Sequence, residues 1–496
     1  MKDLKYWQEQ ARTVRFRNLA MIDGQAVAAA SGKTFATVNP ATGQELAQIA
    51  ACDVDDVNAA VAAARRAFRD GRWSQLPPSE RKAALKRLSE LILQNREELA
   101  LLDSLEMGKP VTDAFDFDVP GAAGVFNWYA EAIDKVYDQI SPTGSHALAM
   151  ITREALGVVA AVVPWNFPLD MAAWKLAPAL AAGNSVILKP AEQSSLSALR
   201  LAELALEAGI PAGVLNVVTG LGETAGRALG LHNDVDCLVF TGSTEVGKLF
   251  LKYSGESNMK QVWLECGGKS ANIVFADCAD LEHAAEMAAF GIFANQGEVC
   301  SASSRLLVER SIHDQLVDKL KQHAQARCPG DPLDPASRSG AIVDDRQTSR
   351  IMEYIDSARS AGASLICGGN QLHINGSGNF IAPTIFTGVT NQMQIAREEI
   401  FGPVLAVIPF DSEEEAISIA NDSIYALAAA VWTDSLNRAH RVARRLQAGT
   451  VSVNTVDALD VTVPFGGGKQ SGFGRDLSLH ALDKYTQLKT TWIQLR

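Results

Sequence analysis

Short runs of β-branched and other apolar residues alternate along the chain with longer, alanine-rich segments that have helical spacing. Strands and helices that follow each other in this rhythm predict an α/β fold with a mainly parallel sheet. In the first half of the chain, the expected elements are strand 157–163, helix 172–182, strand 185–188, helix 199–208, strand 214–218 and strand 235–240.

A second α/β rhythm begins after Gly268. Because 496 residues exceed the size at which one hydrophobic core usually stops growing, we expect two domains with a cleft between them. The pattern shows no internal repeat and no long linker. The expected strands of the second domain are 273–275, 305–308, 405–408 and 450–453, with a helix over 284–294.

Composition and charge narrow the classes of partner. A formal net charge of −12 disfavours nucleic acid as the main partner. The most apolar stretch, 156–188, is interrupted by three prolines and by Asp170 and Lys175, so we expect no membrane partner. The seven cysteines are scattered without a CxxC pair, which predicts neither a disulfide framework nor a metal site. With no apolar secretion signal at the N-terminus, we expect a cytoplasmic protein.

Cys300 lies in a polar, glycine-containing turn, 293–301, that follows a helical pattern. A thiol on such a loop is accessible to a substrate and can act as a nucleophile. The alternative is a small buried hydrophobe, which is what we expect of Cys237 and Cys278.

Two further polar residues suit the same chemistry. Glu265 precedes a pair of glycines that permits close approach of another segment, and apolar neighbours would raise its pKa toward that of a general base. Asn166 lies in a turn between two prolines, which would aim its amide as an oxyanion hole requires. The alternatives are a solvated carboxylate at a strand end and an asparagine in a local turn hydrogen bond.

Three segments have features that suit a dinucleotide. Lys189 and Glu192 follow a strand, at the end where α/β proteins bind nucleotides. Gly242 and Ser243 join a strand to a helix start, where backbone NH groups can hold phosphate, with a simple helix cap as the alternative. The third segment, 398–403, is acidic and aromatic, and its alternative is a surface turn.

Taken in order, these segments resemble the NAD(P)-dependent aldehyde dehydrogenase superfamily from about Leu19 to the C-terminus. Segments 128–137 and 469–476 are most similar to bacterial γ-glutamyl-γ-aminobutyraldehyde dehydrogenases. The sequences that carry the wider resemblance are PWNFP, KPAE, GSTEVG, LECGGK, NQGEVC, EEIFGPV and PFGGGKQSG.

This resemblance implies an aldehyde dehydrogenase-like fold, with a Rossmann-type cofactor domain, an α/β catalytic domain and a small β oligomerisation arm. Residues 1–132 and 154–266 would form the NAD-binding domain and residues 267–475 the catalytic domain. Residues 133–153 and 476–496 would form the arm, which implies a homo-oligomer, either a tetramer or a dimer.

The resemblance also implies the oxidation of an aldehyde to a carboxylic acid with NAD as the cofactor. The Cys300 thiolate would form a thiohemiacetal and then a thioester, Asn166 would hold the oxyanion, and Glu265 would activate the hydrolytic water. Because the Glu192 carboxylate would repel a 2′-phosphate, we expect a preference for NAD over NADP. The residues implied to bind NAD are Val162, Trp165, Lys189, Glu192, Gly242, Ser243, Glu399 and Phe401.

The implied substrate pocket departs from the family pattern in three ways: at Ala294, at Asp170, which replaces an apolar residue near the tunnel, and in the loop 455–460, which differs from that of the most similar subfamily. Ala294 occupies a position where relatives often have an aromatic residue, so we expect a wider tunnel. Asp170, Asp457 and Asp460 lie in segments that flank the expected entrance, where their carboxylates would attract a cationic aldehyde unless they are solvated loop residues or turn formers. The full predicted pocket is Phe167, Asp170, Met171, Trp174, Ala294, Val299, Ser301, Asp457, Leu459 and Phe465.

We therefore expect ω-aminoaldehydes or their γ-glutamyl derivatives as substrates, with broad-range or bulky aromatic or aliphatic aldehydes as the alternative. A CoA-acylating enzyme would not need Glu265 as a base, and a cysteine hydrolase would not need NAD. A non-catalytic structural protein on the same scaffold is the remaining alternative, which the intact catalytic positions disfavour.

Overall fold

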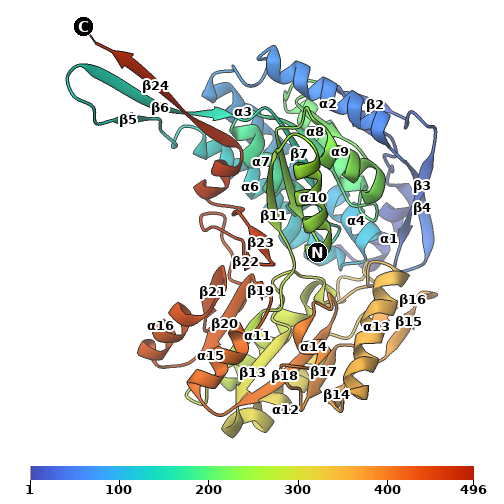
Figure 1. Ribbon diagram of the computed structural model, residues 1–496. Coiled ribbons are helices and arrows are strands. Elements are labelled where there is room, and N and C mark those ends of the chain that lie inside the picture. Colours follow the sequence, from blue (N-terminus) through green and yellow to red (C-terminus); the bar gives the residue numbers. More distant parts are fainter. Residues whose placement is uncertain (1, 496) are drawn as a thin grey trace.

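The computed structural model describes residues 2–495, which form two α/β domains and a β arm that extends from the first domain (Figure 1). An eight-stranded sheet lies at the centre of the first domain, with parallel strands in the middle and antiparallel strands at both edges. Its strands are, in spatial order, β2 (Gln25–Val27), β1 (Ala20–Ile22), β9 (Leu215–Val217), β8 (Ser185–Lys189), β7 (Val158–Val162), β10 (Cys237–Thr241), β11 (Gln261–Glu265) and β23 (Gly472–Phe473).

The central strands of this sheet are apolar on both faces because helices cover both faces. Val159 and Ala161 of β7 belong to a core shared with α3, α6, α7 and α8, whereas Val158 and Ala160 belong to a core shared with α2, α9 and α10. The helices of this domain are α1 (Leu4–Thr13), α2 (Val54–Arg69), α3 (Pro78–Gln94), α4 (Arg96–Met107), α5 (Val111–Asp113), η1 (Ala114–Asp118), α6 (Val119–Ala132), α7 (Pro168–Ala181), α8 (Leu196–Glu207), η2 (Gly222–Gly226), α9 (Arg227–Leu231) and α10 (Thr244–Glu256).

A seven-stranded sheet forms the second domain, and again helices cover both faces. In spatial order its strands are β14 (Ser364–Cys367), β17 (Thr384–Thr387), β18 (Val404–Phe410), β13 (Arg305–Glu309), β12 (Ala271–Val274), β20 (Ala428–Trp432) and β21 (Thr450–Val453). The helices are α11 (Leu281–Phe293), η3 (Ala294–Gly297), η4 (Arg310–Ile312), α12 (His313–Gln325), α13 (Asp345–Ser360), α14 (Gln394–Arg397), α15 (Glu413–Asn421) and α16 (Leu436–Arg445).

The arm is a three-stranded antiparallel sheet that projects away from both domains and carries the C-terminal strand (Figure 1). Its strands are β5 (Gln139–Ser141), β6 (Ala147–Ala155) and β24 (Thr486–Gln494), and η5 (Leu479–Lys484) leads into the last of these. Three two-stranded sheets complete the fold: β3 (Thr34–Asn39) with β4 (Gln44–Ala50), β15 (Gln371–Ile374) with β16 (Ser377–Ile381), and β19 (Tyr425–Ala426) with β22 (Gly468–Lys469).

The predicted fold class is confirmed, and each strand expected from an apolar run is present. One segment does not lie in the domain predicted for it. β23, within the range 267–475 expected to be catalytic, pairs with β11 at the edge of the first sheet. A strand of two residues is too short to show a hydrophobic period, so no local pattern indicated this return. Across residues 2–495, every helix is too short or too polar to span a bilayer.

Candidate active site

The carboxyl ends of the parallel strands in the first sheet gather most of the predicted polar residues at one edge. In the strand register Val162 lies beside Lys189, and Thr241 lies beside Glu265. Gly242 and Ser243 follow β10 directly. The turn that contains Asn166 follows β7, so one sheet edge brings segments together that are up to about a hundred residues apart in the chain.

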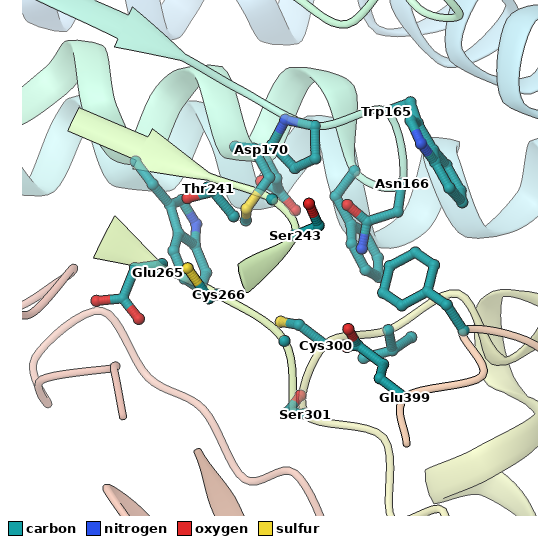
Figure 2. A pocket seen from close by; sticks show the side chains of 18 of the residues that line it. Trp165, Asn166, Asp170, Thr241, Ser243, Glu265, Cys266, Cys300, Ser301 and Glu399 are labelled. Atoms are coloured by element: carbon teal, nitrogen blue, oxygen red, sulfur yellow. The ribbon is translucent and has the colours of Figure 1, made fainter. Parts of the chain in front are cut away.

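A cavity of about 340 Å³ lies where this edge meets the second domain. Figure 2 shows the Cys300 sulfur pointing into it, with Glu265 on one side and Asn166 on the other. Of the residues predicted for the site, the cavity wall contains Trp165, Asn166, Phe167, Asp170, Met171, Trp174, Gly242, Ser243, Glu265, Val299, Cys300, Ser301, Glu399, Phe401, Asp457, Leu459 and Phe465.

A strained turn carries Cys300 to the cavity. Asn295 and Gln296 both have left-handed backbones, with φ of 48° and 58°, and Gly297 follows at 75°. A Cβ at Gly297 would lie 2.3 Å from the carbonyl carbon of Gly402, so only glycine fits there. The turn ends α11 abruptly and directs the residues after it, including Cys300, into the cavity.

Hydrogen bonds join the cysteine loop to the asparagine turn. The Asn166 side-chain amide donates to the Glu298 carbonyl at 2.9 Å, and the Asn295 amide donates to the Asn166 carbonyl at 3.0 Å. Glu298 is itself buried, and its carboxylate accepts a hydrogen bond from the Val343 NH at 3.1 Å. The Asn166 amide, which has two N–H groups, therefore keeps one for a ligand in the cavity.

Glu265 is buried and receives no hydrogen bond from residues 2–495 at either carboxylate oxygen. Burial, reinforced by the nearby charge of Asp476, raises its pKa to about 8. Asp476 also lines the cavity and is ion-paired to two buried lysines, Lys175 and Lys484. Glu265 thus has the properties of a general base that loses its proton near neutral pH.

Burial raises the pKa of the Cys300 thiol, and the carboxylates of Asp457, Glu399 and Glu265 act in the same direction. The thiol is therefore the resting form of Cys300. Nucleophilic attack thus requires that the Cys300 thiol first lose its proton.

Glu399 and Phe401 also line the cavity. The Gly268 NH donates to the Glu399 carboxylate at 3.1 Å, and a Cβ at Gly267 would lie only 2.0 Å from this carboxylate. The glycine pair thus permits the close approach expected from the sequence. Burial raises the pKa of Glu399 to about 7. Phe401 packs edge-on against Trp165, with ring centroids 5.2 Å apart.

The arrangement fits a dinucleotide. Lys189 is buried, and its ammonium donates to the Pro190 carbonyl at 3.0 Å and to the half-exposed Glu192 carboxylate at 3.5 Å. Ser243 caps α10, whose first NH groups can hold phosphate. Val162, Lys189 and Glu192 are not part of the cavity wall; they line the strand edge beyond it, where the adenosine half of a dinucleotide would lie.

Two predictions about the aldehyde pocket need correction. Ala294 is not in the cavity wall, because the backbone extends at this residue and then turns through left-handed conformations that bring Val299 to Ser301 to the cavity instead. Asp460 is also outside it. Its exposed carboxylate accepts a hydrogen bond from the Thr462 NH at 2.8 Å, which makes it a turn former.

Sequence reasoning missed several residues of the wall. Gln347 donates to the Phe401 carbonyl at 2.8 Å and Arg350 to the Glu399 carbonyl at 3.3 Å, so α13 holds the Glu399 loop. The polar, helical sequence around Gln347 and Arg350 contains no pattern that indicates a binding site. Lys175, in contrast, lies within an apolar helix, which indicates that a buried acid lies nearby. The missed wall residues are Pro164, Thr241, Cys266, Gly267, Gln347, Arg350 and Asp476.

Comparison with known proteins gives consistent matches over nearly the whole chain. The model of the aldehyde dehydrogenase family matches residues 27–491. The chain is 56% identical to the NADP/NAD-dependent aldehyde dehydrogenase PuuC of Escherichia coli (strain K12), over 99% of both chains.

Two solved structures are similar over 100% of each chain at 55% identity. One is a γ-glutamyl-γ-aminobutyraldehyde dehydrogenase from Burkholderia cenocepacia, with a TM-score of 0.98. The other is a mutant of a P. syringae indole-3-acetaldehyde dehydrogenase in complex with NAD+ and IAA, with a TM-score of 0.99. Together with the cavity described above, these matches show that the chain belongs to the aldehyde dehydrogenase family and is an NAD-dependent enzyme that oxidises aldehydes to carboxylic acids.

Proposed function

We propose that the enzyme oxidises ω-aminoaldehydes or their γ-glutamyl derivatives, through a thioester on Cys300. The observation that carries this proposal is one cavity that contains Cys300, Asn166, Glu265 and, farther along its wall, the carboxylate of Asp170. Nucleophile, oxyanion donor and base serve the reaction of the aldehyde group, and the additional acid suits a cationic substrate.

In the first step, the sulfur of Cys300 attacks the aldehyde carbon while the thiol proton is released through water to the solvent, so Glu265 remains available as the base of the third step. The free N–H of the Asn166 amide and the Cys300 backbone NH stabilise the resulting oxyanion.

In the second step, Cys300 retains the acyl group as a thioester while the hydride leaves for the acceptor that bound NAD supplies. Lys189 and Glu192 would hold the adenosine ribose, and Ser243 and Trp165 would lie along the pyrophosphate. Glu399 and Phe401 would orient the nicotinamide ribose and ring. Val162, at the buried end of β7, would support the adenosine side.

In the third step, Glu265 takes a proton from water, the water oxygen attacks the thioester, and the acid leaves with the Cys300 sulfur reprotonated. Support for this role comes from the burial of Glu265, its lack of donors and its raised pKa of about 8. A carboxylate that is not hydrogen-bonded is the stronger base.

The substrate class has support from the cavity and from one relative. The cavity wall holds two acids of the substrate region, Asp170 and Asp457. The γ-glutamyl-γ-aminobutyraldehyde dehydrogenase of similar structure acts, by its name, on an aldehyde with nitrogen in its far part.

A second candidate substrate class is bulky aromatic aldehydes. Trp174 and Phe465 form an edge-on aromatic pair in the cavity wall, with ring centroids 5.3 Å apart, and Phe167 lies in the same wall. The structurally similar indole-3-acetaldehyde dehydrogenase acts, by its name, on an aldehyde of this type. Stacking on such rings would favour a flat substrate.

A substrate panel separates these candidates. NADH formation is followed by absorbance with ω-aminoaldehydes, their γ-glutamyl derivatives, straight-chain aldehydes and indole-3-acetaldehyde. We expect the highest kcat/KM with the nitrogen-containing aliphatic aldehydes. A higher value for indole-3-acetaldehyde than for every aminoaldehyde would replace the first candidate by the second.

We also infer that the enzyme is a cytoplasmic homo-oligomer, either a tetramer or a dimer. The arm supports the proposed homo-oligomer, because β24, an edge strand of the arm sheet, exposes apolar side chains such as Leu488 and Trp492. Support for the location comes from the cysteines, all seven of which are free thiols. Size-exclusion chromatography with light scattering measures the assembly directly.

A further inference from the structure

We propose that Asp170 is the residue that selects the substrate, by binding the cationic amino group of the aldehyde across the cavity from Cys300. This inference rests on the proposed function, since it assigns one carboxylate to the recognition of that substrate class. Figure 2 shows Asp170 and Cys300 in separate parts of the cavity wall, so a bound chain can reach both.

The Asp170 carboxylate has no partner of its own. It lies in the first turn of α7, and no group in residues 2–495 donates a hydrogen bond to it. Its Oδ1 atom is enclosed by protein, while the residue as a whole remains partly accessible through the cavity that it lines. A buried carboxylate without donors is costly, and a ligand that brings a donor removes this cost.

The neighbouring cation is already paired. Lys109 forms a buried ion pair with Asp118, and its ammonium lies 4.1 Å from the centre of the Phe167 ring. The groups that face Asp170 are Asp118 at the end of η1, Lys109 between α4 and α5, and Asp103 on α4. Burial and the Asp118 charge raise the Asp170 pKa well above its usual range. A substrate ammonium therefore supplies the positive charge that this cluster lacks.

Gly121 on α6 leaves room for the Asp170 carboxylate. A Cβ at this position would lie 3.0 Å from Oδ1 and 3.3 Å from Oδ2 of Asp170. Glycine inside a helix costs about 1 kcal/mol relative to alanine, and its backbone here does not require a positive φ. The absence of a side chain thus has a local use, which is room for the Asp170 carboxylate.

The other candidate acids are less suitable. Asp457 lies on a solvent-exposed loop beside Ser301, and its charge is the largest electrostatic contribution to the raised pKa of Cys300. It is therefore near the reacting end of the substrate rather than the far end. Asp460 is outside the cavity and bonded to its own turn.

A fixed carboxylate and a general negative field make different predictions. The net charge of −12 attracts any cation, whatever its length, and added salt weakens this attraction. A single carboxylate at a set place beyond Cys300 favours one chain length, because only that chain places its ammonium beside Asp170 while its aldehyde reaches the sulfur.

The test compares straight-chain ω-aminoaldehydes with neutral aldehydes of equal length, at saturating NAD, in the wild type, Asp170→Asn and the control Asp460→Asn. In the wild type, we expect the ratio of kcat/KM for the cationic and neutral aldehydes to peak at one length. In Asp170→Asn, this peak ratio should fall by about tenfold or more, since a buried charge pair is lost. The kcat for neutral aldehydes should stay within about threefold, because the reacting groups are untouched.

The outcomes separate the two claims. A wild-type preference for cations that persists in Asp170→Asn overturns this inference and leaves the proposed substrate class standing. A wild type without any preference for cations overturns both. An equal loss in Asp460→Asn would assign the preference to the general field and would also overturn the inference.

A second measurement does not depend on turnover of the variant. n-Alkylammonium ions of the favoured length should inhibit the wild type in competition with a neutral aldehyde, and the matching alcohols should inhibit more weakly. Gly121→Ala, which keeps the carboxylate but crowds it, should weaken alkylammonium inhibition severalfold and leave inhibition by alcohols unchanged. Equal inhibition constants for alkylammonium in the wild type, Gly121→Ala and Asp170→Asn would contradict the assignment.

Discussion

The two ends of the cavity, one around Cys300 and the other around Asp170, hold their polar groups in different ways. At the first end, hydrogen bonds within the protein hold the oxyanion donor, since the Asn166 amide donates to the Glu298 carbonyl and the Asn295 amide donates to the Asn166 carbonyl; the base there, Glu265, receives no hydrogen bond from the described residues. At the second end, the Asp170 carboxylate receives no donor from the described residues. The reacting end is thus arranged before substrate arrives, whereas the selecting end is completed by the substrate.

This difference predicts that substitutions at the two ends have different effects on substrates. Reacting-end residues act on the aldehyde group, which all substrates share, so their substitution should affect every substrate equally. A residue at the selecting end contacts the far part of the substrate, so its substitution should change the ratio between substrates.

The largest effect should come from Cys300→Ser. A serine hydroxyl is far less ionised than a thiol, so we expect kcat to fall by about a thousandfold or more for cationic and neutral aldehydes alike. The variant should still bind NADH, as measured by fluorescence. Retention of a tenth of wild-type turnover by the folded variant would show that Cys300 is not the nucleophile.

Next in size is Glu265→Gln, which removes the base for hydrolysis. We expect steady-state turnover to fall by about a hundredfold, with a burst of no more than one NADH per site in rapid mixing. The matched control is Glu398→Gln, because Glu398 lies outside the cavity wall and its carboxylate accepts a hydrogen bond from the Tyr354 hydroxyl at 2.7 Å. Normal turnover of Glu265→Gln would remove it from the mechanism.

The pH profile of the wild type gives the third prediction. The Glu265 pKa is raised to about 8, so the base is mostly protonated below that pH and mostly ionised above it. Where hydrolysis limits the rate, kcat should rise by about tenfold per pH unit below this value and level off above it. The same profile is expected for cationic and neutral aldehydes. A kcat that falls as the pH rises from about 6 to 8 would contradict the assigned base.

Glu192→Gln should change the preference for NAD over NADP, by a smaller factor than the effects above. The half-exposed Glu192 carboxylate lies 3.5 Å from the Lys189 ammonium. We expect NAD to be favoured over NADP by about tenfold in kcat/KM, and Glu192→Gln to narrow this ratio. Because Glu192 lies outside the cavity wall, the change should be the same for every aldehyde. A wild-type preference for NADP would refute the assignment.

The smallest effect should come from Asp457→Asn. This residue is exposed, so salt and water screen its charge, and the cationic-to-neutral ratio of kcat/KM should fall by less than about threefold. The fall should disappear at high salt. A loss as large as that expected for Asp170→Asn would place the selecting acid on the loop that carries Asp457.

Much of the fold and the reacting end could be predicted from the sequence, because both depend on local patterns. Apolar runs mark the strands that are covered on both faces, and residues at strand ends such as Glu265 meet at one sheet edge. Contacts between distant segments could not be predicted this way. Lys175 in its apolar helix indicates a buried acid nearby, but no local pattern indicates that this acid is Asp476, which is 301 residues away.

The end of the cavity around Asp170 could not be predicted from local sequence patterns either. Asp170, Asp457 and Asp460 were indistinguishable in the sequence, since each is an acid near the expected entrance. The structure separates them by burial and partners: Asp460 is bonded to its own turn and Asp457 is exposed, whereas Asp170 is partly buried beside Gly121, with its Oδ1 atom enclosed and without a donor. Burial of this kind depends on how α6 packs against α7, which no local pattern specifies.

The most direct test of the proposed chemistry is the mass of Glu265→Gln after mixing with NAD and an ω-aminoaldehyde. The account predicts that one acyl group accumulates per chain and that peptide mapping locates it on Cys300, in step with the burst of NADH. NADH formation without an adduct, or an adduct on another cysteine such as Cys266, would contradict it.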